Sequence, residues 1–454
     1  MELPVSVRQL LEETVPGWAL RESSDDVSDV LRTVLLGDDQ GQVQVIFRHQ
    51  DLFDISTFNE QLGRDFHIVP LKHQMRVCER LGVKTVPALP TLTGLPCYID
   101  KTVDSSSAVC VYVDGHSSER LLLDGKAFGL LTVDSDRVAA AVPVTGIGVN
   151  LNRPEDDQAQ LQSALKRFTG LRIQQRLDDT LELPPLPETA QRIIHLRVNP
   201  NAVMGDLVDV VESDPSLAAQ VVSWASSSFY ASAAEVRSVH DAVSRILGFD
   251  LVMNLAMGLA LGRALKQPSD QPAGYLGYWQ QAIWQAQSAG TLASMMRRGE
   301  RPAYGLAYLA GLLHNFGYLV LAQVFPPHFK LACRSWEVNP HLDTAIVEHH
   351  LLGVTREQIG AQLMSNWGMP DEINTAIRHQ KDLDYAGTHS VYPKLLWLGR
   401  QLLTARGIPV GVGESVPDSV FDQLGLNRKM VEEQFDELVQ NKASIMAMAG
   451  MMQS

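Results

Sequence analysis

A helix start is encoded in the octapeptide Val211-Glu212-Ser213-Asp214-Pro215-Ser216-Leu217-Ala218. Asp214 suits the N-cap, because its carboxylate can accept free backbone N–H groups of a first helical turn, and Pro215 suits the position that follows. Apolar residues then recur with helical spacing at Leu217, Val221, Val222 and Trp224. The octapeptide therefore predicts a helix with one buried face.

Residues typical of helix starts and helix ends recur towards the C-terminus. Thr355-Arg356-Glu357-Gln358 has the form of a capping box ahead of an apolar run, and Gly368 with Pro370 closes that helix. From about residue 170 onward nearly every segment has helical periodicity, so this part is predicted to be all-α. The Met-rich stretch from Ile445 to Met452 is predicted to be a peripheral helix.

The first third of the chain differs, since short apolar runs separated by turn residues dominate it. Arg32 to Leu36 and the alternating run Val43 to Phe47 flank a Gly-Asp-Asp-Gln-Gly turn, which predicts a β-hairpin with one buried face. Leu71 to Leu81 has helical spacing. A second strand pattern comprises Val109, Val111, Val113, Asp114-Gly115 and Leu121 to Leu123. The first third is therefore predicted to be mixed α/β.

These patterns predict a multidomain α+β protein. We expect a mixed α/β domain at residues 1–150, a polar and helical linker at 151–172, an all-α domain at 173–380 and a C-terminal helical extension at 381–454.

Charge and composition restrict the classes of partner. The chain of 454 residues has 38 basic and 52 acidic side chains, hence a formal charge of −14, which repels phosphate backbones. A nucleic-acid site would have to be a local patch, and no DNA partner is expected. The four cysteines show no C-x-x-C spacing, so neither a disulfide framework nor a zinc knuckle is predicted.

The sequence contains no pattern typical of export or membrane insertion. Met1 to Glu13 lacks a basic region followed by an apolar core, and the most apolar stretch, Tyr304 to Phe325, is interrupted by His314 and Asn315. We therefore expect a cytoplasmic protein without a membrane span.

The helical part resembles the HDOD domain, the HD-related output domain of bacterial signalling proteins, over about residues 174–380. The order and spacing of seven motifs carry this resemblance. They are Leu183-Pro184-Pro185-Leu186-Pro187-Glu188, the octapeptide above, Val239-His240-Asp241-Ala242-Val243, Leu247-Gly248, Gly311-Leu312-Leu313-His314-Asn315-Phe316-Gly317, Glu348-His349-His350 and Trp367-Gly368-Met369-Pro370.

The resemblance implies a metal site that this chain has lost. HD phosphohydrolases hold metal with a His, a His-Asp pair and a distal Asp, whereas the matching positions here are Gln281, His314-Asn315 and the neighbourhood of Gly399-Arg400. Amide oxygens are weak ligands beside carboxylates, and a guanidinium repels a cation. The substitutions predict a degenerate site with no metal and no cofactor.

An alternative is that His314, His349 and His350 still gather one metal ion, together with Glu348. Adjacent His349 and His350 point to different sides of a helix, which disfavours a shared ion. We therefore interpret these histidines as hydrogen-bonded core or cleft residues. Six aromatic residues could form an interaction surface, but their helical spacing favours packing. They are Trp224, Phe229, Tyr230, Trp279, Trp284 and Trp336.

The first third resembles, more loosely, the YbaK-type aminoacyl-tRNA deacylase domain over about residues 5–143. The resemblance rests on the hairpin Thr33 to Phe47, the Gly63 turn, the Pro87 to Thr93 loop, Leu95 to Asp100 and Asp124 to Leu131. It implies ester hydrolysis without metal or covalent nucleophile, in a pocket lined by backbone amides and a Lys.

The candidate deacylase-like pocket contains Arg32, Thr33, Pro87 and Asp100. The family places Lys before Thr on the first strand, whereas this chain has Arg32, and an arginine stays protonated at neutral pH and so cannot relay a proton. Asp100 fits either a pocket residue or a turn residue. On the predicted helix, Lys72, Arg76 and Arg80 form a basic stripe that could face RNA or simply solvent.

Two readings of function result. The leading hypothesis is a bacterial regulatory protein in which a catalytically inert HDOD output domain, acting on protein partners of a signalling pathway, is coupled to a degenerate deacylase-like sensor. The runner-up is an active aminoacyl-tRNA deacylase that removes amino acids from mischarged tRNA and is regulated by the HDOD domain. A phosphohydrolase acting on nucleotides ranks last.

Overall fold

The chain folds as two compact units. A computed structural model describes residues 3–15, 18–22, 30–104, 107–112, 119–172, 185–227, 229–230 and 236–452, so the patterns at residues 113–115 and 183–184 lie outside it. The first unit contains Met1–Gly148 together with Pro272–Gly274 and Leu331–Val347, and the second contains Val149–Gln271, Tyr275–Lys330 and Glu348–Ser454. Two segments from the second half of the sequence therefore belong to the N-terminal unit.

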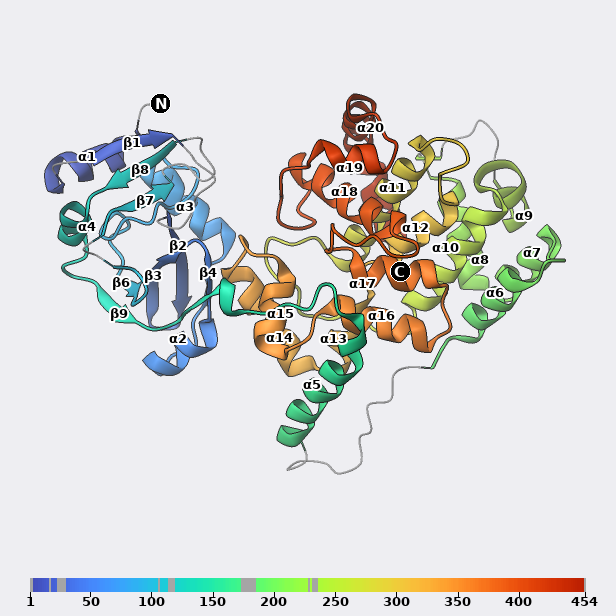
Figure 1. Cartoon of the computed structure of the whole chain (residues 1–454), viewed down its shortest axis with the longest axis horizontal. Helices are drawn as coiled ribbons and strands as arrows, with labels where there is room; N and C mark the ends of the chain where they lie inside the picture. Colours follow the sequence, from blue (N-terminus) through green and yellow to red (C-terminus); the bar gives the residue numbers. More distant parts are fainter. Residues whose placement is uncertain are drawn as a thin grey trace. The chain divides into compact units, whose positions relative to one another are not determined.

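The first unit is built on a mixed β-sheet (Figure 1). Its described strands are β1 (Trp18–Glu22), β2 (Val30–Asp38), β3 (Gly41–Arg48), β4 (Asp51–Phe53), β5 (His67–Ile68), β6 (Cys97–Asp100), β7 (Val109–Tyr112), β8 (Glu119–Leu123), β9 (Asp136–Val138) and β10 (Ala141–Pro143). The strand order is β1-β8-β7-β2-β3-β6-β9, with β5 added to β2 and with β4 and β10 paired separately. The β2–β7, β3–β6 and β6–β9 pairs are parallel and the rest are antiparallel.

The remaining elements are helices, which confirms a mixed α/β part followed by an all-α part. The first unit has α1 (Val5–Thr14), α2 (Ile55–Leu62), α3 (Leu71–Leu81) and α4 (Gly125–Leu131). Next come α5 (Asp157–Arg172), α6 (Glu188–Val198), α7 (Met204–Glu212), α8 (Pro215–Ala225), α9 (Val239–Asp241), α10 (Phe249–Gly262), α11 (Tyr278–Met295), α12 (Tyr304–Leu313), α13 (Phe316–Val324), α14 (Pro326–Val338), α15 (Thr344–Leu352), α16 (Arg356–Asn366), α17 (Asp371–His379), α18 (Val391–Ala405), α19 (Asp418–Gln423), α20 (Arg428–Gln440) and α21 (Lys442–Met451).

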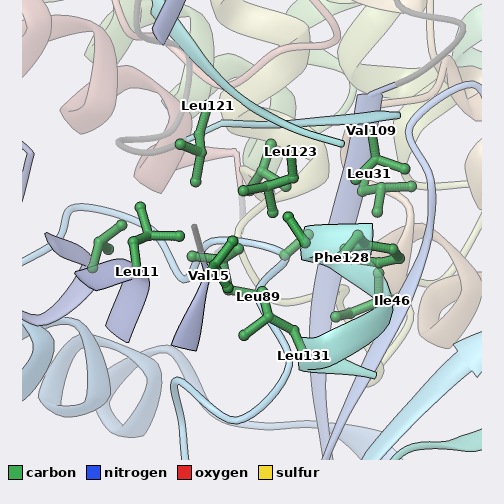
Figure 2. Close-up of a cluster of buried hydrophobic side chains, with 14 of the residues drawn as sticks. Leu11, Val15, Leu31, Ile46, Leu89, Val109, Leu121, Leu123, Phe128 and Leu131 are labelled. Carbon is green, nitrogen blue, oxygen red and sulfur yellow. The ribbon is translucent and has the colours of Figure 1, made fainter. Parts of the chain in front are cut away.

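The predicted hairpin forms, but the expectation of one buried face is wrong. Strand β3 is buried continuously from Val43 to Phe47, because both faces of the sheet are covered. On one face, α1 and α4 contribute Leu11, Phe128 and Leu131 to a cluster that includes Ile46 (Figure 2). On the other face, residues of α2 and Val338 of α14 pack against alternate residues of β3.

Asn339 fixes the α14–α15 connection to the N-terminal sheet. Its side chain is fully buried, with 0% exposure, and its Nδ2 donates to the carbonyls of Phe53 and Ser335, each at 2.9 Å. Its Oδ1 accepts the backbone N–H of Phe53 at 2.8 Å. The amide thus pairs with both backbone groups of Phe53 as a neighbouring strand would.

Helix caps in the second unit match the sequence patterns. Asp214 accepts the N–H of Leu217 at 3.0 Å with Pro215 at the start of α8, and Thr355 forms the capping box of α16. Within the predicted linker, Asp157–Arg172 forms α5, whose Asp157 pairs with Arg378 of α17. The Met-rich C-terminal stretch forms α21, which buries Ile445, Met448 and Ala449 on one face and leaves other residues exposed.

The apolar segment Tyr304–Val324 forms the interior of the second unit. By length and composition this segment could cross a membrane. However, 94% of its most apolar part is buried inside the protein, and the segment is divided into the two helices α12 and α13. Helix α13 crosses α16 very closely, since a Cβ on Gly317 would lie 1.9 Å from the carbonyl oxygen of Arg356. The aromatic side chains of Trp224, Trp279, Trp284 and Trp336 are buried, as expected for packing residues.

The Asn339 contacts predict a measurable loss of stability. Asn339→Ala should lower the free energy of unfolding by about 2–4 kcal/mol, because the buried N–H and C=O of Phe53 lose their partners. Urea denaturation followed by fluorescence and circular dichroism measures this loss. The exposed Asn201→Ala should stay within about 0.5 kcal/mol of the parent. Equal stability of the two variants would show that Asn339 is not an anchor.

Candidate functional site

A cavity of about 360 Å³ opens beside strand β2 in the first unit. Of the expected pocket residues, Arg32 and Thr33 line it and Pro87 and Asp100 do not. Its wall is completed by apolar and polar residues from six segments of the chain. These residues are Leu31, Val34, Leu35, Ile68, Val69, Leu71, Gln74, Met75, Cys78, Lys84, Thr85, Val86, Ala88, Tyr112, Ala273, Gly274, Glu337, Val338 and Pro340.

Thr33 is held by a buried polar chain that also fixes the neighbouring loop. Gln44 Nε2 donates to the Thr33 hydroxyl at 3.0 Å and to the carbonyl of Leu89 at 3.2 Å, and Gln44 Oε1 accepts the Thr93 hydroxyl at 2.8 Å. Gln44 therefore ties strand β3 to the loop that follows α3. This loop brings Lys84 to the cavity wall.

Arg32 lies close to a buried histidine contributed by the second half of the sequence. Burial lowers the pKa of His341 well below its usual value, and the charge of Arg32 lowers it further. His341 Nε2 also lies 3.2 Å from the carbonyl oxygen of Asp51. Arg32 therefore faces a neutral imidazole and contributes fixed positive charge at this end of the cavity.

Asp100 has a structural role instead of the expected pocket position. Its Oδ2 accepts the backbone N–H groups of Ala140 and Ala141, each at 2.8 Å, and its Oδ1 accepts that of Thr102 at 2.8 Å. The carboxylate joins the end of β6 to the start of β10. Pro87 is buried and its carbonyl accepts the N–H of Leu89 at 2.8 Å.

The expected basic stripe lies on α3 beside the cavity. Lys72, Arg76 and Arg80 are exposed, while other residues of the same helix line the cavity. Arg80 donates to the carbonyl of Thr93 at 3.0 Å, so part of its guanidinium is bound to the protein itself.

Glu337 is the carboxylate among the lining residues, and sequence reasoning missed it. Its Oε1 accepts the N–H of Ala273 at 2.6 Å, and burial raises its pKa. It stands some 300 positions after β2 in the sequence, so no local pattern connects it with a pocket there. Only the packing of α14 in the first unit reveals it.

The second unit brings Gln281 and Asn315 together, as the HD resemblance implies. Asn315 Nδ2 donates to Gln281 Oε1 at 3.3 Å. Its Oδ1 accepts Nη1 of Arg356 at 3.0 Å, and the Arg356 guanidinium also pairs with Glu348. Glu348 is 0% exposed and Arg356 8%, so this cluster is buried.

Arg356 lies in contact with Asn315 and Glu348. Burial lowers the pKa of its guanidinium, but the carboxylates of Glu348 and Glu357 outweigh burial and raise it, so the positive charge is permanent. The oxygens of Asn315 and Glu348 are committed to that charge. A metal cation therefore does not fit these residues, because it would be repelled by Arg356 and would find two amides in place of carboxylate and imidazole.

The histidines do not converge on one point. His314 Nδ1 lies 2.7 Å from the carbonyl oxygen of Gly311, and burial, with Arg400 and Arg356, lowers its pKa to about 4. The pKa of His349 is lowered by burial and by Arg167, a residue of α5. His350 follows on α15. Within the described part of the chain, no three His, Cys, Asp or Glu side chains are grouped so that they could hold a metal ion.

The neutral His314 predicts a pH-dependent stability. An unfolded histidine binds a proton below about pH 6.5, whereas folded His314 stays neutral down to about 4. The unfolding free energy should therefore fall as the pH drops through this window, and His314→Gln should reduce the fall by about 3 kcal/mol. Urea titrations at several pH values measure it, with the exposed His240→Gln as control. An unchanged slope in His314→Gln would contradict a neutral His314.

The chain is similar over its whole length to the crystal structure of a candidate signal transduction protein from Marinobacter aquaeolei VT8. The two are 64% identical, with a TM-score of 0.93 and coverage of 100% of each chain. An HDOD domain protein from Geobacter sulfurreducens shares the fold, at 20% identity, a TM-score of 0.52, and coverage of 64% of this chain and 98% of its own.

Two further matches are partial. An uncharacterized protein from Treponema pallidum (strain Nichols) is 28% identical over 221 residues, which is 47% of this chain and 40% of that relative, so the chain matches less than half of its length. A candidate trans-editing enzyme for prolyl-tRNA synthetase aligns with 30% of this chain and 95% of its own, at 15% identity and a TM-score of 0.26.

The helical region matches a family model directly. Residues 183–383 match the HDOD domain, a range that contains Gln281, Asn315, Glu348 and Arg356. Together with the full-length similarity to the Marinobacter protein, this match shows that the chain belongs to the HDOD domain family.

Proposed function

We propose that this protein is a cytoplasmic bacterial signalling protein that acts by binding and relay. Its HDOD domain would be a pseudoenzyme that contacts protein partners, and its N-terminal unit a degenerate deacylase-like sensor. The observation that carries this proposal is the buried guanidinium of Arg356 between Asn315 and Glu348. The description of the Marinobacter relative as a candidate signal transduction protein is in agreement.

The cost of breaking its contacts favours a cluster of Asn315, Glu348 and Arg356 that stays intact. Removing one partner from a buried ion pair costs about 3–5 kcal/mol, because the other charge is left unpaired in the interior. Displacing Arg356 to admit a metal ion would carry this cost. The cluster therefore supports an architectural role for residues that resemble a metal site.

Helix α15 provides the route of the proposed relay. Its first residues, up to Val347, belong to the first unit and its last residues, from Glu348, to the second. The preceding connection carries the anchor Asn339 and also His341, which lies near Arg32 of the cavity. A change at the cavity would thus reach Glu348 along one continuous helix.

Metal analysis tests the proposed inertness. Full-length protein incubated with Mn²⁺, Zn²⁺ or Mg²⁺ and then desalted should contain no stoichiometric metal, because Arg356 supplies the positive charge of the site. It should not hydrolyse bis-p-nitrophenyl phosphate or cyclic dinucleotides faster than His314→Gln does. Stoichiometric metal with hydrolysis that is lost in His314→Gln would overturn the pseudoenzyme proposal and favour a phosphohydrolase.

One observation favours the alternative function, a tRNA deacylase. Lys84 lines the cavity together with Arg32, so a lysine is present although it does not precede Thr33 in sequence. Such a lysine and the oriented loop could stabilise a developing oxyanion. The exposed Lys72 and Arg76 would then contact phosphates of the tRNA.

Deacylation of a panel of mischarged tRNAs separates the two functions. The relay proposal expects no turnover by the full chain above the uncatalysed rate, and the same result for Arg32→Ala and Lys84→Ala. Turnover that is lost in Arg32→Ala and kept in Arg32→Lys would establish the deacylase instead. Arg8→Ala is the matched control, since Arg8 is an exposed arginine of α1 that lies outside both the basic stripe and the cavity wall.

A further inference from the structure

The cavity in the first unit carries charges of both signs at different places. Among the residues that line it, the charged ones are Arg32, Lys84 and Glu337. The two cations come from the N-terminal sheet and its loop, whereas Glu337 comes from α14. A ligand that satisfies all three must itself be dipolar.

Glu337 lies on α14, whereas Arg32 lies on β2 and Lys84 on the loop after α3. Burial raises the pKa of the Glu337 carboxyl group, and the charges of His67 and Arg334 lower it. Its Oε1 accepts the N–H of Ala273, and its Oε2 accepts no hydrogen bond from the residues that the structure describes. One carboxylate oxygen therefore remains available to a cation of the ligand.

The rest of the wall is largely apolar. Ile68, Val69 and Val86 line it, and at its edge Leu71 and Met75 are 63% and 53% exposed. Exposed large apolar side chains around a concave site are typical of ligand-binding surfaces. A volume of about 360 Å³ suits a compact organic molecule, because drug-sized sites range from about 300 to 1,000 Å³.

We propose that this cavity binds a small free zwitterion, with its carboxylate on Arg32 and Lys84, its ammonium group on Glu337 and an apolar body between them. This inference rests on the proposed sensor function and names the class of its ligand. Glu337 would couple the ligand to α14, since the ammonium group contacts a side chain of that helix. A polyanion such as tRNA would gain nothing from Glu337.

Calorimetric titration of the full chain tests the ligand class. The probes are leucine and ε-aminocaproate, each with its acid lacking the amine (isocaproate, caproate) and its amine lacking the carboxylate (isoamylamine, hexylamine). At least one zwitterion should bind about tenfold or more tightly than both of its analogues, because each charge-assisted hydrogen bond contributes about 1.5–3 kcal/mol. Failure of both zwitterions to bind, or equal affinity for the matching acid, would overturn the proposal.

Variants assign the two ends of the ligand. Glu337→Gln should reduce affinity for the zwitterion to that of its acid and leave the affinity for the acid unchanged, whereas Arg32→Ala should weaken both. Glu79→Gln, an exposed carboxylate on α3 outside the cavity wall, should change neither. Equal weakening of zwitterion and acid in Glu337→Gln would indicate a general loss of structure and contradict the assigned ammonium contact.

Hydrogen exchange on the same samples separates this proposal from the relay. Zwitterion binding that changes amide exchange in α15 supports both the proposed ligand class and the proposed relay. Binding without any change in α15 supports the ligand class and contradicts the relay. A third outcome is that the zwitterions do not bind, whereas mischarged tRNA binds and Lys84→Ala abolishes that binding. The proposed ligand class would then be wrong, and the deacylase function would be favoured.

Discussion

The buried charge of Arg356 constrains the second unit more than any other single group. A guanidinium at 8% exposure requires compensation, which Glu348 and the Asn315 amide provide. This geometry depends on the approach of α13 to α16, where Gly317 leaves no room for a Cβ next to the Arg356 carbonyl. The glycine contact brings Asn315 within reach of Arg356. The residues that would hold a metal are thus used to neutralise a side chain.

The first unit has a comparable dependence on a distant segment. One face of its sheet is covered by α1 and α4, but the other packs against Val338, and Asn339 satisfies both backbone groups of Phe53. A fragment ending at residue 150 would remove Val338 from that face and leave the backbone groups of Phe53 without the Asn339 side chain. The N-terminal unit is therefore complete only in the full chain, and experiments on its function require the full chain.

Local sequence signals predicted local structure well. The N-cap at Asp214, the capping box at Thr355 and the helix Leu71–Leu81 were all readable, because each depends on residues within one or two turns. Glu337 and Arg356 were not readable as site residues, since their roles arise from contacts across distant segments. Asp100 followed a strand and fitted either a pocket residue or a turn residue. Only the structure shows that its carboxylate binds the backbone N–H groups of Ala140 and Ala141 and does not line the cavity.

The strength of the Arg356 cluster limits how a signal could pass through it. Separating a buried ion pair costs about 3–5 kcal/mol, whereas a ligand with millimolar affinity supplies about 4 kcal/mol in total. A small ligand could not break the Glu348–Arg356 pair and still bind well. We infer that any relay along α15 keeps this pair intact and moves α15 and the N-terminal end of α16 together, since Glu348 also accepts the backbone N–H of Arg356 at 2.7 Å. The inert site would then be a rigid coupling between two helices.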